Sequence, residues 1–92
     1  MKIVVRRVEK ATILDVSGSI DISNSLEVRK VLLQEIRGKD VSRVVLNLTD
    51  VGYIDTATVA SLVEALKASR EKGLRFVLFG LSEYVRESLK IT

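Results

Sequence analysis

The stretch YIDTATVASLV, residues 53–63, decides the fold, because the chain changes there from an apolar run to a long amphipathic helix. Asp55 stands where the N-cap of this helix belongs, since an Asp carboxylate can accept hydrogen bonds from the unpaired N–H groups of a first helical turn. Gly73 is expected to end the helix as a left-handed C-cap. Apolar residues at the spacing i, i+3, i+4, i+7 predict one helical face packed against a sheet. They are Val59, Leu62, Val63 and Leu66.

Apolar runs rich in β-branched residues predict four strands. Residues 3–5 and 11–16 are interpreted as a hairpin that turns at Glu9 and Lys10, and residues 75–80 as the last strand. The run 44–48 suits either a central strand covered on both faces or a strand that alternates around Val45 and Asn47.

Two further helices are predicted by their start signals and apolar spacing. Asn24 and Glu27 have the spacing of a capping box, Gly38 is expected to end that helix in the left-handed conformation, and Ser82 can cap a final short helix. The apolar residues expected to face the core are Leu26, Val28, Val31, Leu32 and Ile36 in the first helix, with Val85 and Leu89 in the last.

The resulting order, β-β-α-β-α-β-α, predicts an α/β fold with a four-stranded mixed sheet. The first strand pair is antiparallel, and right-handed crossovers between the later parallel strands place both long helices on the same face of the sheet. The opposite face then depends on the last helix, the chain termini or a partner. This arrangement favours a binding module.

Composition excludes several kinds of catalytic site. The 92-residue chain contains no Cys and no His, which rules out disulfides, thiolate zinc sites and both Ser-His-Asp and Cys-His catalysis within it. Its five glycines are isolated, so no phosphate-binding loop is indicated. We therefore expect a small domain without a cofactor and without enzymatic activity.

The charge pattern argues against nucleic acid as a partner. The net charge is +3, but the basic residues are scattered among acids, and the pair Arg6-Arg7 is too small for a stripe across several phosphates. No apolar run approaches the ~20 residues that a membrane span needs, so a cytoplasmic protein without membrane insertion is expected.

Three acids, Asp21, Asp50 and Asp55, follow predicted strands and could in principle gather around a magnesium ion. No Lys is placed to complete a phosphoryl-accepting site of this kind. We therefore expect no metal site.

Several motifs in register resemble those of the STAS domain family, typified by bacterial anti-sigma factor antagonists. They are Gly18-Ser19-Ile20-Asp21, the strand at residues 44–48, the segment 51–59 around the Asp55-Thr56 junction, and Gly73 before the last strand. The resemblance spans nearly the whole chain and implies one STAS-like domain over residues 1–92. Members of the family usually continue through a further C-terminal helix, so the resemblance also implies that this chain is either truncated or short.

By the same resemblance, Thr56 corresponds to the residue that a partner kinase phosphorylates, and the kinase also acts as the anti-sigma factor. The family pattern has Gly where Thr58 stands here, and a β-branched residue is expected to crowd the start of the helix. The implied partner is an anti-sigma factor kinase or a related protein of the ATPase fold, and this chain is expected to be a monomer or a weak dimer. The implied partner-binding residues are Asp21, Ser23, Tyr53, Asp55, Thr56, Ala57 and Thr58.

Alternatives stay open at this point. Asp55-Thr56 can be an ordinary helix start, Asp21 a turn or capping acid, and Tyr53 either an exposed anchor or a half-buried residue at a strand end. Two other functions also fit the resemblance. One is an accessory subunit that docks on a lipid-transport ATPase, with Thr56 as a contact, and the other is a subunit of a stress-signalling scaffold.

Overall fold

A computed structural model describes residues 1–90 of the chain. Its strands and helices follow the predicted order, and each predicted element is present. The bounds are β1 (Lys2–Val8), β2 (Ala11–Ser17), α1 (Ser25–Ile36), β3 (Arg43–Asp50), α2 (Thr56–Lys72), β4 (Arg75–Phe79) and α3 (Glu83–Lys90).

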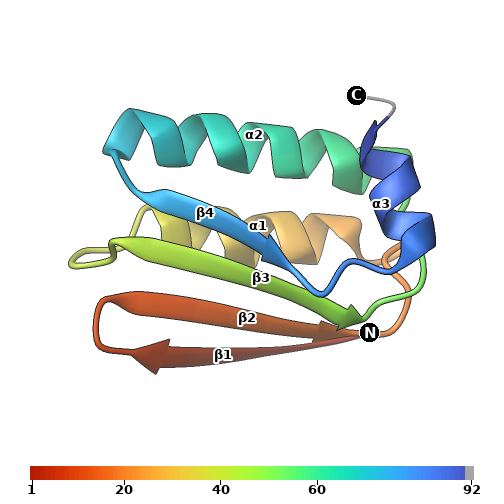
Figure 1. Ribbon diagram of the computed structural model, residues 1–92, viewed down its shortest axis with the longest axis horizontal. Helices are drawn as coiled ribbons and strands as arrows, with labels where there is room; N and C mark the ends of the chain where they lie inside the picture. Colours follow the sequence, from red (N-terminus) through yellow and green to blue (C-terminus); the bar gives the residue numbers. More distant parts are fainter. Residues whose placement is uncertain (91–92) are drawn as a thin grey trace.

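The four strands form one mixed sheet in the order β1-β2-β3-β4 (Figure 1). The hairpin β1/β2 is antiparallel, and β2/β3 and β3/β4 are parallel. Each parallel pair is joined by a helix, and α1 and α2 lie side by side on one face of the sheet. The predicted α/β fold is confirmed, including the placement of both long helices on the same face.

The core lies between this face and the two helices. Buried and half-buried residues alternate along β3, with Val44, Leu46 and Leu48 inward and Val45 and Asn47 on the other side. Of the two interpretations of residues 44–48, the alternating strand is therefore the correct one. A strand that buries only one face leaves the outer face of the sheet open to solvent.

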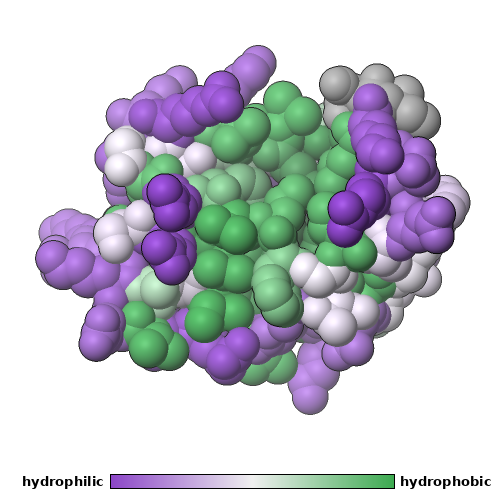
Figure 2. Space-filling model, in the orientation of Figure 1, coloured by the Kyte–Doolittle hydropathy of each residue, from purple (hydrophilic) through white to green (hydrophobic). Residues whose placement is uncertain are grey.

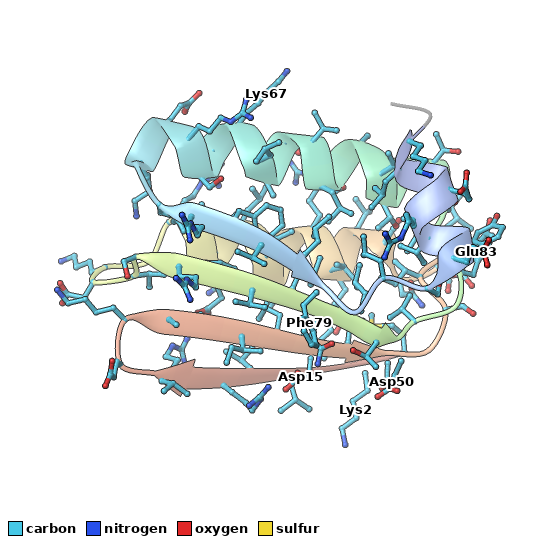
Figure 3. The ribbon with its side chains drawn as sticks, viewed as in Figure 1. Lys2, Asp15, Asp50, Lys67, Phe79 and Glu83 are labelled. Carbon is cyan, nitrogen blue, oxygen red and sulfur yellow. The ribbon has the colours of Figure 1, made fainter. Side chains whose placement is uncertain are left out.

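Hydrophobic side chains gather over the middle of the outer face and continue toward α2 (Figure 2). Phe79 stands on this face with 59% of its surface exposed, above Asp15 in Figure 3. The Asp15 carboxylate accepts hydrogen bonds from the guanidinium of Arg6 and from Asn47 Nδ2, and these bonds lower the pKa of Asp15. Polar cross-strand pairs thus stabilise a surface that none of the helices within residues 1–90 covers.

The capping box predicted at the start of α1 is wrong. Asn24 occupies the N-cap position, but its side chain makes no capping hydrogen bond. Its Oδ1 instead accepts from the Asp21 N–H at 2.9 Å, and its Nδ2 donates to the Ser19 carbonyl at 3.1 Å. The Asn24 side chain is therefore bonded to the loop before the helix and is not available for a capping box.

The left-handed cap predicted at Gly38 is also wrong. α1 ends with Arg37 in the right-handed helical region, where the N–H of Arg37 donates to the Leu33 carbonyl at 3.0 Å and that of Gly38 to the Glu35 carbonyl at 3.1 Å. These bonds tighten the last turn, and the chain takes its positive φ, 58°, two residues later at Asp40.

Three residues predicted to be apolar core positions are exposed. Leu26 of α1 is 75% exposed, and Leu33 contributes to the core instead. Val63 and Leu66 of α2 are 39% and 37% exposed. The buried helix faces are rotated away from the stripes predicted from the sequence, because α1 and α2 pack against each other as well as against the sheet. The buried helical residues are Ser25, Val28, Leu32, Leu33 and Ile36 of α1 and Thr58, Val59, Leu62, Ala65 and Ser69 of α2.

The last helix, α3, lies beside the start of α2 (Figure 1). Ser82 caps it as predicted, since its Oγ accepts from the Val85 N–H at 3.2 Å. Val85 is fully buried and anchors the helix to the core. None of the helices within residues 1–90 combines the length and hydrophobicity that a membrane span requires.

Candidate partner-docking site

The start of α2 is built on Asp55, as predicted. Its extended backbone, with φ −89° and ψ 173°, turns the chain from the strand side into the helix. Its Oδ1 atom accepts the Thr58 N–H at 2.8 Å, and its carbonyl accepts the Val59 N–H at 3.2 Å. The carboxylate also complements the positive end of the helix dipole.

The two threonines of the first turn face opposite ways. Thr58 is only 1% exposed, and its hydroxyl donates to Asp55 Oδ1 at 2.5 Å. Thr56, the first residue of α2, is exposed. The threonine in the place of the family glycine therefore points into the protein and does not crowd the outer surface, and Thr56 carries the accessible hydroxyl.

Backbone bonds join this junction to the loop after β2. The Asp55 N–H donates to the Ile20 carbonyl and the Ile20 N–H to the Tyr53 carbonyl, both at 3.0 Å, and Ile20 and Ile54 form a parallel bridge. Asp21 follows Ile20 directly. The loops after β2 and β3 thus bring Asp21 and Asp55 to the same end of the sheet.

Asp21 is a turn residue, which was one of its two predicted interpretations. Its Oδ1 accepts the N–H of Ser23 at 2.9 Å and the Ser23 hydroxyl at 2.5 Å. The Ser23 hydroxyl, and then its backbone N–H, lower the pKa of Asp21 and keep the carboxylate charged. Ser23 thereby lies beside Asp21, as an exposed residue outside the helix.

Tyr53 is exposed, at 41% of its surface, and is not the half-buried residue of its second predicted interpretation. Its ring packs against that of Tyr84 on α3, with ring centroids 5.5 Å apart and the planes tilted by 30°. An open cavity of about 260 Å³ lies beside the pair, lined by Thr56 and, from α3, by Tyr84 and Ser88. Sequence reasoning missed these two residues, although their i, i+4 spacing places them on one face of α3.

The acids near this end do not gather around a cation. The carboxylates of Asp21 and Asp55 each bind within their own turn. The other two acids of this region stand on different elements: Asp50 ends β3, and Glu83 begins α3, at the right of Figure 3. Within residues 1–90, no group of three or more acids has the arrangement of a metal site.

Comparison with known proteins identifies the family. The STAS domain family matches residues 2–92, so this chain belongs to that family. The anti-sigma-B factor antagonist of Listeria monocytogenes is 32% identical over 78 residues, which cover 84% of this chain and 67% of the relative.

Solved structures share the fold. The Bacillus cell fate determinant SpoIIAA in its phosphorylated form superposes with a TM-score of 0.81 at 13% identity, covering 98% of this chain and 82% of that one. An anti-sigma factor antagonist from Mycobacterium paratuberculosis gives a TM-score of 0.82 at 13% identity, with 98% and 75% covered. The predicted STAS fold is thereby confirmed.

Proposed function

We propose that this protein is an anti-sigma factor antagonist that docks on its anti-sigma factor through the start of α2 and dissociates when Thr56 is phosphorylated. The observation that carries the proposal is the exposed Thr56 at the first position of α2, in a chain related to an anti-sigma-B factor antagonist. The anti-sigma factor would be a serine/threonine kinase that modifies Thr56 itself. The neighbouring Asp21, Ser23, Tyr53 and Ala57 would contact it, while Thr58 would support Asp55 from within.

A phosphate at Thr56 is compatible with the fold. It adds about −1.5 to −2 charges at neutral pH. At the first residue of α2 it would meet the positive end of the helix dipole and the N–H groups of the first turn. Thr56 is exposed, so no buried contact within the domain has to break.

The interface is where the phosphate acts. A partner packed against Thr56 would have to make room for the group and strip it of water beside the Asp55 carboxylate. A loss of only ~3 kcal/mol of binding free energy weakens a complex more than a hundredfold. Phosphorylation would therefore separate the two proteins while leaving this domain folded.

The test uses the anti-sigma factor kinase from the same organism. The chain is incubated with the kinase and ATP, and its intact mass and peptide map are recorded. We expect one phosphate on Thr56, none on the Thr56→Val variant, and the unchanged reaction on Ser61→Ala, which alters a hydroxyl one turn further along α2. An unmodified Thr56, together with unchanged kinase binding by Thr56→Asp, would contradict the proposal. Stable copurification with a transporter ATPase and no kinase would favour the accessory-subunit alternative.

A further inference from the structure

The segment between β2 and the first turn of α1 carries the two most exposed large hydrophobic side chains of residues 1–90. Ile22 is 89% exposed and Leu26 75%, followed by Phe79 at 59%. A single exposed apolar residue is ordinary on a protein surface. Two within five residues, beside the proposed docking site, form a patch that calls for a partner.

The loop holds Ile22 outward. The Asp21 carbonyl accepts the N–H groups of Asn24 at 3.1 Å and Ser25 at 2.8 Å, and the Asp21 carboxylate accepts from Ser23. The loop thus satisfies its polar groups internally. Ile22 is left on the outside of a closed turn, and an anchor held in this way loses little freedom on binding.

Contacts between the two helices place Leu26 near the start of α2. Arg29 of α1 donates twice to the Glu64 carboxylate of α2, each time at 2.8 Å, which aligns the helices. One turn toward the N-termini stand Leu26 on α1 and Ala60 on α2, and a further turn along α2 leads to Thr56. Ala60 is exposed and small, so its side chain adds little bulk between Leu26 and Thr56.

We infer that Ile22 and Leu26 are hydrophobic anchors that insert into an apolar pocket of the anti-sigma factor and determine which anti-sigma factor this protein recognises. The inference rests on the proposed function and adds a recognition surface on α1 to the switch on α2. Asp21 and Glu27 flank the anchors and form no ion pair within the described part of the chain, while the exposed Lys30 lies one turn beyond Leu26 on α1. The fitting pocket is therefore apolar at its centre and carries Lys or Arg where it meets Asp21 and Glu27.

The same charges disfavour a second copy of this chain as the occupant. A symmetric pair of copies that met through Ile22 and Leu26 would bring equal surfaces together. Asp21 and Glu27 of both copies would then be crowded around one interface, and like charges across an interface oppose association. A basic-rimmed apolar pocket on a different protein meets both features of the patch.

The test is calorimetric titration of the purified anti-sigma factor from the same organism with the full chain and its variants. We expect Ile22→Ala and Leu26→Ala each to weaken binding about tenfold, and the double variant about a hundredfold, from the apolar surface no longer buried. Leu26→Met should stay within about threefold of wild type, because it keeps the volume and the apolar character. Val8→Thr removes an exposed hydrophobic side chain on β1 and should leave binding unchanged. Leu26→Gln retains helix propensity, and gives the same test if an alanine variant is poorly folded.

The outcomes separate the two proposals. If the wild-type chain binds no anti-sigma factor, the proposed function fails and the anchors fail with it. If wild type and the double variant bind within about twofold of each other, the proposed function stands and the anchoring is refuted. If sedimentation shows a wild-type dimer that the double variant abolishes, a second copy covers the patch and the inference is overturned.

Discussion

Asp55 Oδ1 accepts two hydrogen bonds from Thr58, one from its N–H at 2.8 Å and one from its hydroxyl at 2.5 Å. One carboxylate oxygen thus caps α2 and satisfies a threonine that is 1% exposed. Thr56 makes no side-chain hydrogen bond within residues 1–90 and stays accessible. In the first turn of α2, Asp55 and Thr58 therefore stabilise the structure, and the side chain of Thr56 faces solvent.

Replacing Asp55 by Ala should lower the free energy of unfolding by about 1–2 kcal/mol, because the helix loses its N-cap and the buried Thr58 hydroxyl loses its acceptor. Urea unfolding followed by circular dichroism measures the change. Asp50→Ala, at the exposed end of β3, is the matched control and should stay within about 0.5 kcal/mol of wild type. Equal stability of the two variants would show that the Asp55 cap is unimportant.

The Thr58 hydroxyl can be tested separately from its shape. Thr58→Val keeps the branched side chain but removes the donor to Asp55, and should cost about 0.5–1.5 kcal/mol of unfolding free energy. Thr58→Ser keeps the hydroxyl, so it should retain the hydrogen bond to Asp55 that Thr58→Val loses. Kinase treatment should phosphorylate both variants at Thr56 as in wild type. A Thr58→Val protein as stable as wild type, or one unmodified at Thr56, would assign Thr58 a different role.

Local signals explain why α2 could be predicted from the sequence at both ends. Asp55 accepts its own helix N–H groups, and Gly73 adopts a left-handed φ of 70°, so each cap depends only on neighbouring residues. The inward direction of Thr58 could also have been found, since residues 58, 62, 65 and 69 share one helical face and all are buried. The expectation that Thr58 crowds the surface did not take account of this helical spacing, which turns residue 58 toward the core.

Features set by tertiary packing could not be predicted. Asn24 has the spacing of a cap, yet the loop after β2 captures its side chain at Asp21 and Ser19. The exposure of Leu26 depends on how α1 lies against α2, and the pairing of Tyr53 with Tyr84 depends on where α3 docks. The contacts of α1 with α2 and of Tyr53 with Tyr84 join segments that are distant in the sequence. At Asn24, the loop and the helix end compete for the same side chain. The position of the Asp55-Thr56 junction was predictable, but the exposure of Leu26 and the packing of Tyr84 beside Tyr53 were not.

The turn at Asp21 should make stability depend on pH. Hydrogen bonds from Ser23 lower the pKa of Asp21 in the folded protein, so this group stabilises the fold above its unfolded pKa, and the contribution is lost as pH falls through the folded value. Between about pH 5 and pH 2, Asp21→Asn should therefore lose less stability than wild type. Urea unfolding across this range measures the difference. Asp50→Asn serves as the control, and an Asp21→Asn protein with the wild-type pH dependence would refute the prediction.

Substituting Thr56 by Asp should separate folding from binding. An acid at the first position of α2 meets the helix dipole favourably, so the free energy of unfolding should stay equal or rise by about 0.3–1 kcal/mol. Binding to the anti-sigma factor should fall at least about tenfold, because the new charge must be desolvated at the interface. Thr56→Asn has nearly the same shape without the charge, and should bind more tightly than Thr56→Asp. Equal weakening by both variants would mean that the interface rejects the shape of the side chain, and that phosphate does not act there through its charge.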